Sequence, residues 1–386
     1  MRRKAKPTSR ARYESFGGIV AIDDPVGLAF VDQQFMRELG YPDAPLWQDT
    51  QRRFLSAPTE VHFNLTARCP LACRHCTTDA GEGEELDTAA IKRALDVLAR
   101  AGVFHVAFGG GELFVRPDAI ELARYARSRG LVPNATSNGH VLTRALAARC
   151  RVFGQVNISM DGVGEGYRAV RAAGEFAKAD QALHWLVEAG VVTGINCVVS
   201  RTNFDGLEDV MAHADRLGLV EVLFLRLKPS GRAQAVYHDL RLTPEQGRAL
   251  FPRLRTLARR YRPRVQVDCS FIPHLCAHRP SRRLMQALGV DGCGAGNLLL
   301  GVRADGSING CSHHPDSFGD VRDLPVLWDG HPHFQTFRQR QVDHPTCRAC
   351  RYFPVCRGGC PLFSQFLLGD FCAPDPECPR IVDAKD

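Results

Sequence analysis

The chain has 386 residues, 45% of them hydrophobic and 24% charged, and a formal net charge of +7. This balance is typical of a folded protein with room for two domains, and it excludes a mainly disordered chain. No apolar run approaches the roughly 18–20 residues of a membrane span, and the N-terminus lacks the apolar stretch of a secretory signal. We therefore expect a cytoplasmic protein with no membrane partner.

The N-terminal region begins with a basic arm, in which six basic residues precede the first acidic residue, Glu14. We interpret this arm as a solvated extension and expect no nucleic-acid partner. Residues 15–22, "SFGGIVAI", predict a strand. Residues 26–40 predict a helix, because their apolar residues recur at helical spacing, namely Leu28, Val31, Phe35 and Leu39. We group residues 1–55 as an N-terminal segment with a basic arm, a strand and a helix.

Between residues 60 and 232 the sequence repeats one theme, in which a short apolar run is followed by a polar or glycine-rich turn and a helical stretch. Six strands are predicted, at residues 60–66, 105–111, 132–138, 155–161, 192–200 and 221–229. Helices are predicted near residues 87–102, 117–129, 174–189 and 206–217. This alternation predicts an α/β fold with a parallel sheet that is either open or curved into a barrel.

Chemistry-bearing residues follow the first four predicted strands. After the first strand come three cysteines, and the later clusters are Gly110-Gly111-Glu112, Ser137-Asn138, and Ser159 with Asp161. Any one of these clusters alone could simply consist of residues that favour a turn. Because the carboxyl ends of parallel strands meet at one edge of the sheet, the four together predict a single site there.

The loop after the first strand carries Cys69, Cys73 and Cys76, and no further cysteine follows until Cys150. A structural zinc site takes four protein ligands, and His75, between two of the cysteines, could serve only with strained geometry. A [4Fe–4S] cluster held by three thiolates leaves one iron free for a small chelating molecule, such as an amino acid. Fifteen cysteines in a chain expected to be cytoplasmic favour metal ligation over disulfides.

The three-cysteine loop, "GGGE" at the second strand, "SNG" at the third and "SMDG" at the fourth together resemble the radical S-adenosylmethionine (SAM) superfamily over residues 60–232. The resemblance implies a partial (β/α)6 barrel in which Cys69, Cys73 and Cys76 are the catalytic residues and ligate a SAM-binding [4Fe–4S] cluster. It also implies SAM contacts from Gly110, Gly111, Glu112, Ser137, Asn138, Ser159, Asp161, Arg171, Asn196, Val198 and Leu225. Leu113 stands where the family often has proline, and we expect little effect.

Ten of the fifteen cysteines lie from Cys269 onward. Their order is Cys293-x12-Gly306-x4-Cys311, then Cys347-x2-Cys350-x5-Cys356-x3-Cys360, then Cys378. This pattern is similar to the SPASM extension of radical SAM enzymes, which holds two auxiliary iron–sulfur clusters. The resemblance assigns one cluster to Cys347, Cys350, Cys356 and Cys378, and the other to Cys293, Cys311 and Cys360.

The second auxiliary set lacks a fourth ligand. Cys269, Cys276, His313 and His314 are candidates, and we favour either Cys269 or an open coordination site. Zinc is an alternative metal for this region, although a zinc site would leave the cysteines of the second set without a ligand role. We interpret Cys150, Cys197 and Cys372 as buried or spare thiols.

The C-terminal motifs most resemble the maturases of ribosomally made peptides, notably those of mycofactocin and pyrroloquinoline quinone. We therefore expect an enzyme that cleaves SAM to a 5′-deoxyadenosyl radical and oxidatively modifies a precursor peptide by crosslinking or decarboxylation. A separate leader-recognition protein and a flavodoxin- or ferredoxin-like reductant are expected partners. The alternatives are a tetrapyrrole, another small molecule or a sulfatase as substrate, and, more distantly, a zinc-stabilised binding protein.

The expected domains are the radical SAM core at residues 56–235, a connecting segment at 236–268 with an arginine-rich helix over 241–262, and the SPASM domain at 269–386. Arg226 and Lys228, at the end of the sixth strand, are candidate substrate contacts.

Overall fold

A computed structural model of the chain describes residues 10–23, 26–171, 174–290 and 292–383. Its main feature is a nine-stranded sheet with the order β10-β9-β8-β7-β6-β5-β4-β11-β12. The six predicted strands are confirmed and are all parallel: β4 (Glu60–Thr66), β5 (His105–Gly110), β6 (Val132–Ser137), β7 (Val156–Ser159), β8 (Thr193–Val199) and β9 (Glu221–Arg226).

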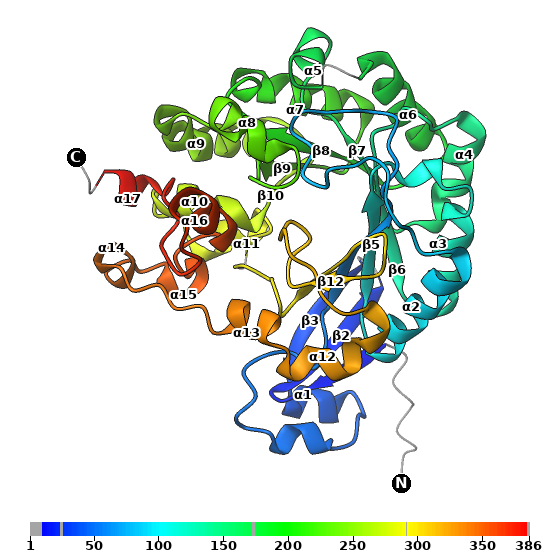
Figure 1. Cartoon of the computed structure of the whole chain (residues 1–386), viewed down its shortest axis with the longest axis vertical. Coiled ribbons are helices and arrows are strands. Elements are labelled where there is room, and N and C mark those ends of the chain that lie inside the picture. The colour runs from blue at the N-terminus through cyan, green and yellow to red at the C-terminus, as the bar shows by residue number, and fades with distance from the viewer. Residues whose placement is uncertain (1–9, 24–25, 172–173, 291, 384–386) are drawn as a thin grey trace.

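Helices cover the convex side of this curved sheet, so the unit is a partial barrel (Figure 1). They are α2 (Thr88–Arg100), α3 (Ala119–Ser128), α4 (Arg144–Arg149), α6 (Phe176–Glu188) and α7 (Leu207–Leu217). In α2 the Asp87 carboxylate caps the helix by accepting a hydrogen bond from Ala90 N, and Ile91, Leu95 and Leu98 are fully buried. Four of these helices match the predicted ranges, and α4 was not predicted.

Segments after residue 230 extend the sheet at both ends. β10 (Arg264–Val267) pairs in parallel with β9, and β11 (Leu299–Val302) pairs in parallel with β4 and carries the two-residue strand β12 (Ile308–Asn309). These three strands were not predicted, because each is too short to show a clear apolar period. The arginine-rich helix is confirmed as α9 (Pro244–Arg260), and α8 (Ala233–Leu240) and α5 (Glu165–Val170) are additional.

The N-terminal segment forms a three-stranded antiparallel sheet of β1 (Ala11–Glu14), β2 (Gly17–Asp23) and β3 (Val26–Asp32). The predicted helix over residues 26–40 is therefore wrong in its first half, and only α1 (Gln33–Glu38) is helical. The apolar residues of this run fit the spacing of a helix and that of a strand. Hydrogen bonding to β2 in the folded protein decides between them. Residues 1–9 of the basic arm lie outside the described residues.

The cysteine-rich region consists of short helices and loops. The helices are α10 (Ile272–Cys276), α11 (Arg282–Ala287), α12 (Leu324–Gly330), α13 (Pro332–Arg338), α14 (Pro345–Arg348), α15 (Phe353–Cys356), α16 (Pro361–Leu368) and α17 (Pro379–Val382). Most of this region lies across the open side of the barrel from α3 and α4 (Figure 1). Among the described residues, no helix is both long and apolar enough to cross a membrane.

Candidate active site

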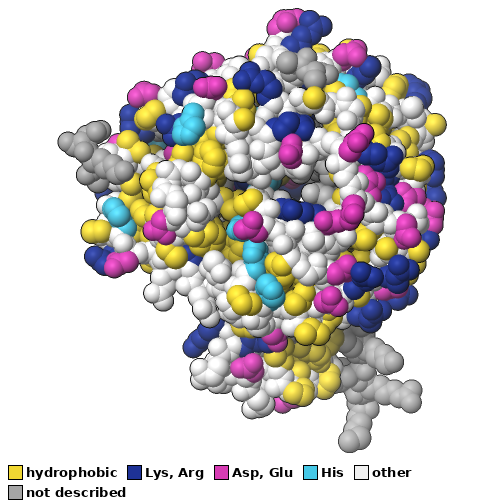
Figure 2. Space-filling model, in the orientation of Figure 1, with side chains coloured by type: hydrophobic (Ala, Val, Ile, Leu, Met, Phe, Trp, Pro, Cys, Tyr) yellow, Lys and Arg dark blue, Asp and Glu magenta, His cyan; other side chains and the backbone are white. Residues whose placement is uncertain are grey.

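A cavity of about 500 Å³ lies inside the barrel at the carboxyl ends of its strands. Figure 2 shows a hollow near the centre of the molecule, between the barrel and the C-terminal segments. The cavity is lined by most of the site residues predicted from sequence, namely Cys69, Cys73, Cys76, Gly110, Gly111, Ser137, Asn138, Ser159, Arg171, Asn196, Val198 and Leu225. Glu112 and Asp161 do not line it. The structure thus brings the predicted set to one place and puts these two carboxylates behind the wall.

Each thiol of the three-cysteine loop has a hydrogen-bond donor beside it. Cys69 Sγ lies 3.4 Å from Leu71 N and 3.6 Å from Asn138 Nδ2. Arg171 Nη1 lies 4.0 Å from Cys73 Sγ, and Thr78 Oγ1 lies 3.4 Å from Cys76 Sγ. Donors that point at sulfur are the usual surroundings of cluster thiolates, so these residues fit a [4Fe–4S] cluster.

The three thiols differ in acidity. Burial raises the pKa of Cys69 and of Cys73. Burial acts in the same direction on Cys76, but hydrogen bonds from Thr78 and the Ala80 backbone outweigh it and lower the pKa of that thiol.

The glycines of "GGGE" let two loops touch. Gly110 has a φ of +125°, and a Cβ on it would lie 2.2 Å from Thr66 O. A Cβ on Gly111 would lie 2.2 Å from Arg68 O. Gly111 N and Glu112 N donate to Thr66 O and Arg68 O at 2.8 Å each. These glycines therefore hold the start of the cysteine loop against the end of β5, besides facing the cavity.

Glu112 holds the loop after β6. Its carboxylate, 1% exposed, accepts hydrogen bonds from Ser137 Oγ at 2.8 Å, Asn138 N at 2.6 Å and Phe114 N at 3.1 Å. Burial raises its pKa, against the hydrogen bonds from Asn138 and Ser137. This network fixes the backbone of Asn138, whose side chain reaches Cys69.

Asp161 organises the opposite wall. Its carboxylate is fully buried and contacts Arg171 Nε at 2.5 Å, His75 Nε2 at 3.0 Å and Val198 N at 2.7 Å. Burial alone would raise the pKa of Asp161, but Arg171 and His75 lower it to about 2. The carboxylate thereby stays charged and holds Arg171 next to Cys73. Sequence reasoning treated His75 only as a strained zinc ligand and missed this role.

The four cysteines of the first auxiliary set line one cavity. Cys347, Cys350, Cys356 and Cys378 are joined there by Cys276 and Arg380. Arg380 Nη1 lies 3.7 Å from Cys350 Sγ. Cys276 was considered as a ligand of the second set, and the structure instead places it in the cavity of the first set, beside Cys350 and Cys378. Burial and these two thiols raise the pKa of Cys276 to about 12.

The thiols of the second set lie close to one another. The Cys269 thiol is hydrogen-bonded to Cys293, and Cys360 is a further neighbour of Cys269. The pKa of Cys360 is raised mainly by burial and further by the neighbouring Cys293 and Cys311. Cys269 is thus a direct neighbour of two thiols of the second set. His314 instead packs on His333 with ring centroids 4.8 Å apart, and His313 faces the large cavity.

Within the described part of the chain, no three Cys, His, Asp or Glu side chains lie close enough to hold a single metal ion. The thiols of the first auxiliary set surround a space instead. A [4Fe–4S] cluster suits such spacing, because each thiolate binds a different iron.

Comparison with known proteins decides the family. The family model described as "Radical SAM superfamily" matches residues 63–214. The chain is 35% identical over 337 residues to the mycofactocin maturase MftC of Mycobacterium ulcerans, with 84% of this chain and 88% of the relative covered. The chain belongs to the radical SAM superfamily.

Two further relatives align with a similar fraction of this radical SAM enzyme. An AdoMet-dependent heme synthase of Nitratidesulfovibrio vulgaris is 27% identical, covering 82% of this chain and 91% of the relative. A PqqA peptide cyclase of Rhodopseudomonas palustris is 30% identical, covering 83% and 86%. The crystal structure of Streptococcus suis SuiB bound to precursor peptide SuiA has a TM-score of 0.78 at 14% identity over 98% of this chain and all of that one, and shares the fold.

Arg232 is a site residue that sequence reasoning missed. It lies just before α8, and its guanidinium donates to Cys73 O at 3.2 Å and Ala80 O at 2.5 Å. Ser230 Oγ donates to Thr77 O at 3.0 Å. The segment after β9 therefore closes on the cysteine loop of this radical SAM enzyme. No local sequence motif predicts this contact, because the partners are about 150 residues apart in the chain.

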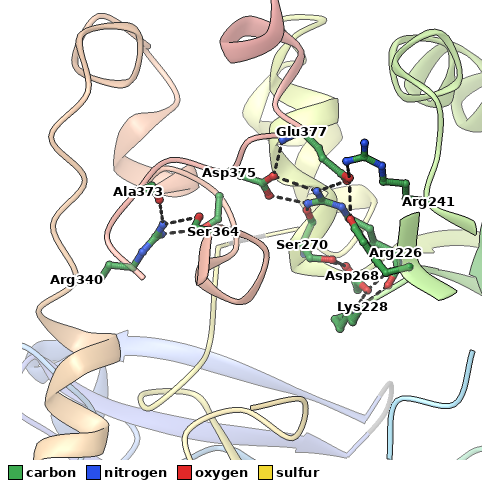
Figure 3. Close-up of polar contacts among 12 residues, drawn as sticks. Arg226, Lys228, Arg241, Asp268, Ser270, Arg340, Ser364, Ala373, Asp375 and Glu377 are labelled. Carbon is green, nitrogen blue, oxygen red and sulfur yellow. Dashed lines mark hydrogen bonds and ion pairs between the residues drawn. The ribbon is translucent and has the colours of Figure 1, made fainter. Parts of the chain in front are cut away.

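Arg226 and Lys228 were candidate substrate contacts, but both are held in ion pairs and neither lines the large cavity. Arg226 is buried and forms ion pairs with Asp375 at 2.6 Å and Glu377 at 2.8 Å (Figure 3). Lys228 is paired with Asp268, next to Cys269. Both side chains tie the end of β9 to the cysteine-rich region.

Proposed function

We propose that this radical SAM enzyme oxidatively modifies a ribosomally made precursor peptide, by a crosslink or a decarboxylation. The observation that carries the proposal is the 35% identity to a mycofactocin maturase over 84% of this chain. The SuiB fold, solved with a precursor peptide, is consistent with it over 98% of the chain.

Cys69, Cys73 and Cys76 are the proposed ligands of the catalytic [4Fe–4S] cluster. When bound, the cluster and SAM supply a 5′-deoxyadenosyl radical that abstracts a hydrogen atom from the substrate. The protein positions the reactants: Asn138, Arg171 and Thr78 support the three thiolates. Gly110, Gly111, Ser137, Ser159, Asn196, Val198 and Leu225 are the proposed SAM contacts on the cavity wall.

Glu112 and Asp161 act in this proposal as positioning residues. Each carboxylate is almost fully buried and holds groups that do line the cavity, Ser137 and Asn138 in one case and Arg171 in the other. Buried charges held by several donors keep such a wall rigid, which suits a site that must align SAM with its substrate.

The auxiliary clusters are assigned to Cys347, Cys350, Cys356 and Cys378, and to Cys269, Cys293, Cys311 and Cys360. Residues 56–235 and 269–386 are the proposed core and SPASM domains, joined by residues 236–268. Residues 14–46 of the N-terminal segment are proposed to help bind the peptide leader, together with a separate recognition protein. The electron source is a flavodoxin- or ferredoxin-like protein.

The Cys269→Ser variant tests the fourth ligand. We expect the electron paramagnetic resonance signal of one auxiliary cluster to change or disappear after anaerobic reconstitution, because a serine oxygen replaces a thiolate. The matched control is Cys276→Ser, which keeps all eight proposed auxiliary ligands. Identical spectra for Cys269→Ser and wild type would contradict the assignment.

The function is tested with each short peptide that is found to be encoded beside this gene. Under anaerobic conditions with reductant and SAM, we expect the peptide to change mass while 5′-deoxyadenosine accumulates. The heme synthase relative keeps a tetrapyrrole as the second candidate, so the same assay is run with a tetrapyrrole substrate. Deoxyadenosine coupled to tetrapyrrole conversion, with unchanged peptide, would overturn the peptide assignment.

A further inference from the structure

The cavity of the first auxiliary set lies at the edge of the molecule. α14 and α15, which carry Cys347 and Cys356, stand on the side opposite α3 and α4 (Figure 1). All four thiols of the set are only partly buried. A cluster held there would be near the surface, within reach of a partner protein.

The two segments beside this cavity are strongly basic. Residues 277–290 and 344–369 contain no Asp or Glu. They carry five exposed arginines, which we call the arginine surface: Arg279, Arg282, Arg283, Arg348 and Arg351. Tyr352 Oη donates to Pro280 O at 2.7 Å, which joins the two segments. Arg348 and Arg351 are direct neighbours in sequence of Cys347 and Cys350.

Most of this charge is not neutralised by the protein itself. Arg348 pairs with Asp343. Over residues 10–23, 26–171, 174–290 and 292–383, none of the other four arginines forms an ion pair. Some exposed arginines elsewhere in these ranges are paired, as Arg262 is with Asp215 at 2.9 Å, and others such as Arg93 and Arg124 are not. What distinguishes the arginine surface is that four unpaired arginines lie on two joined segments without acidic residues. Unpaired positive charges on one face attract an acidic partner and speed its encounter.

We propose that the arginine surface docks an acidic one-electron carrier protein of the flavodoxin or ferredoxin class. One electron leaves the reduced carrier and enters the neighbouring cluster, and no bond forms or breaks. Redox encounters use small, charge-steered interfaces, which fits a few arginines around a cluster. A peptide substrate fits less well, because the surface borders the cysteine cavity and none of its five arginines lines the large cavity.

The test compares two double variants of the reconstituted holoenzyme. Arg282→Glu/Arg283→Glu changes the arginine surface, and Arg93→Glu/Arg124→Glu makes the same charge change on exposed, remote positions of α2 and α3. The probe is a bacterial flavodoxin, reduced for kinetics and oxidised for binding. For the first variant we expect binding and the rate of cluster reduction to fall by about tenfold or more at low ionic strength, with a weaker salt dependence. Reduction by dithionite should be unchanged in both variants.

Equal losses in both double variants, or none in either, would overturn the docking site. So would weaker binding of precursor peptide with unchanged binding of flavodoxin, which would make the surface a peptide site. Arg348→Gln/Arg351→Gln removes charge more mildly and must show the same direction. The inference rests on the proposed cluster ligands, whose failure has its own signature: iron too low for two auxiliary clusters even in the wild type.

Discussion

Replacing Cys73 by alanine should abolish SAM cleavage. Cys73 is a proposed ligand in the middle of the three-cysteine loop, and its sulfur lies 4.0 Å from Arg171 Nη1. A cluster with two remaining thiolates on this loop would not assemble stably, so we expect about four of roughly a dozen irons per chain to be lost. The measurement is iron and sulfide content, followed by 5′-deoxyadenosine formation with dithionite and SAM.

Cys150→Ala is the matched control for this experiment. Cys150 is buried at the end of α4, its sulfur is hydrogen-bonded to Leu146 O, and it does not line the cavity. This variant should keep the full iron content and SAM cleavage, with a small loss of stability from the lost sulfur. If Cys73→Ala still formed deoxyadenosine at the wild-type rate, the assigned cluster site would be wrong.

Replacing Arg226 by methionine should give the largest loss of stability. Its guanidinium is buried between Asp375 and Glu377, and it lies 3.5 Å from the ring centroid of Phe363. The change leaves buried Asp375 without its counter-charge, which costs about 3–5 kcal/mol. Because Asp375 and Glu377 lie within three residues of Cys378, we also expect loss of iron from the first auxiliary set. Thermal unfolding and iron analysis check both effects.

This variant should also change the dependence of stability on pH. Burial would raise the pKa of Asp375, but Arg226 outweighs it and holds the pKa below its usual value. Wild-type stability from this pair is therefore present above a pH of about 4 and is lost as the pH falls through the lowered pKa. Arg226→Met lacks that contribution, so its free energy of unfolding should fall less on acidification.

Arg241→Met is the control for the ion-pair network. Arg241 shares Glu377 at 3.2 Å, but it is partly exposed (Figure 3). Removing an exposed partner costs about 1 kcal/mol or less. A loss for Arg241→Met as large as that for Arg226→Met would contradict the claim that burial of Asp375 drives the effect.

Sequence patterns predicted the barrel well because each βα unit is local. β4, β5, β6, β7, β8 and β9 lie within the predicted ranges, as do α2, α3, α6 and α7. The same reasoning failed at residues 26–32, where an apolar run could satisfy the period of a helix or a strand. Its pairing with β2 decided the outcome.

The site residues also fall into two groups, those that a local sequence motif predicts and those that only long-range contacts bring together. The cavity collects Cys69, Cys73 and Cys76 because they sit on one short loop after β4, so their spacing alone carries the information. Arg232 reaches that loop from a segment about 150 residues later, and Arg226 meets Asp375 across a similar separation. No local pattern encodes such contacts.

The sequence by itself determined the order of the βα units, the three-cysteine loop and the presence of a cysteine-rich second region, because these depend on neighbouring residues. The tertiary structure alone decided that Cys276 joins Cys350 and Cys378 while Cys269 joins Cys293. It also decided that Glu112 and Asp161 lie behind the cavity wall. The physical reason is that burial and long-range packing bring together side chains whose separation along the chain carries no signal of their contact.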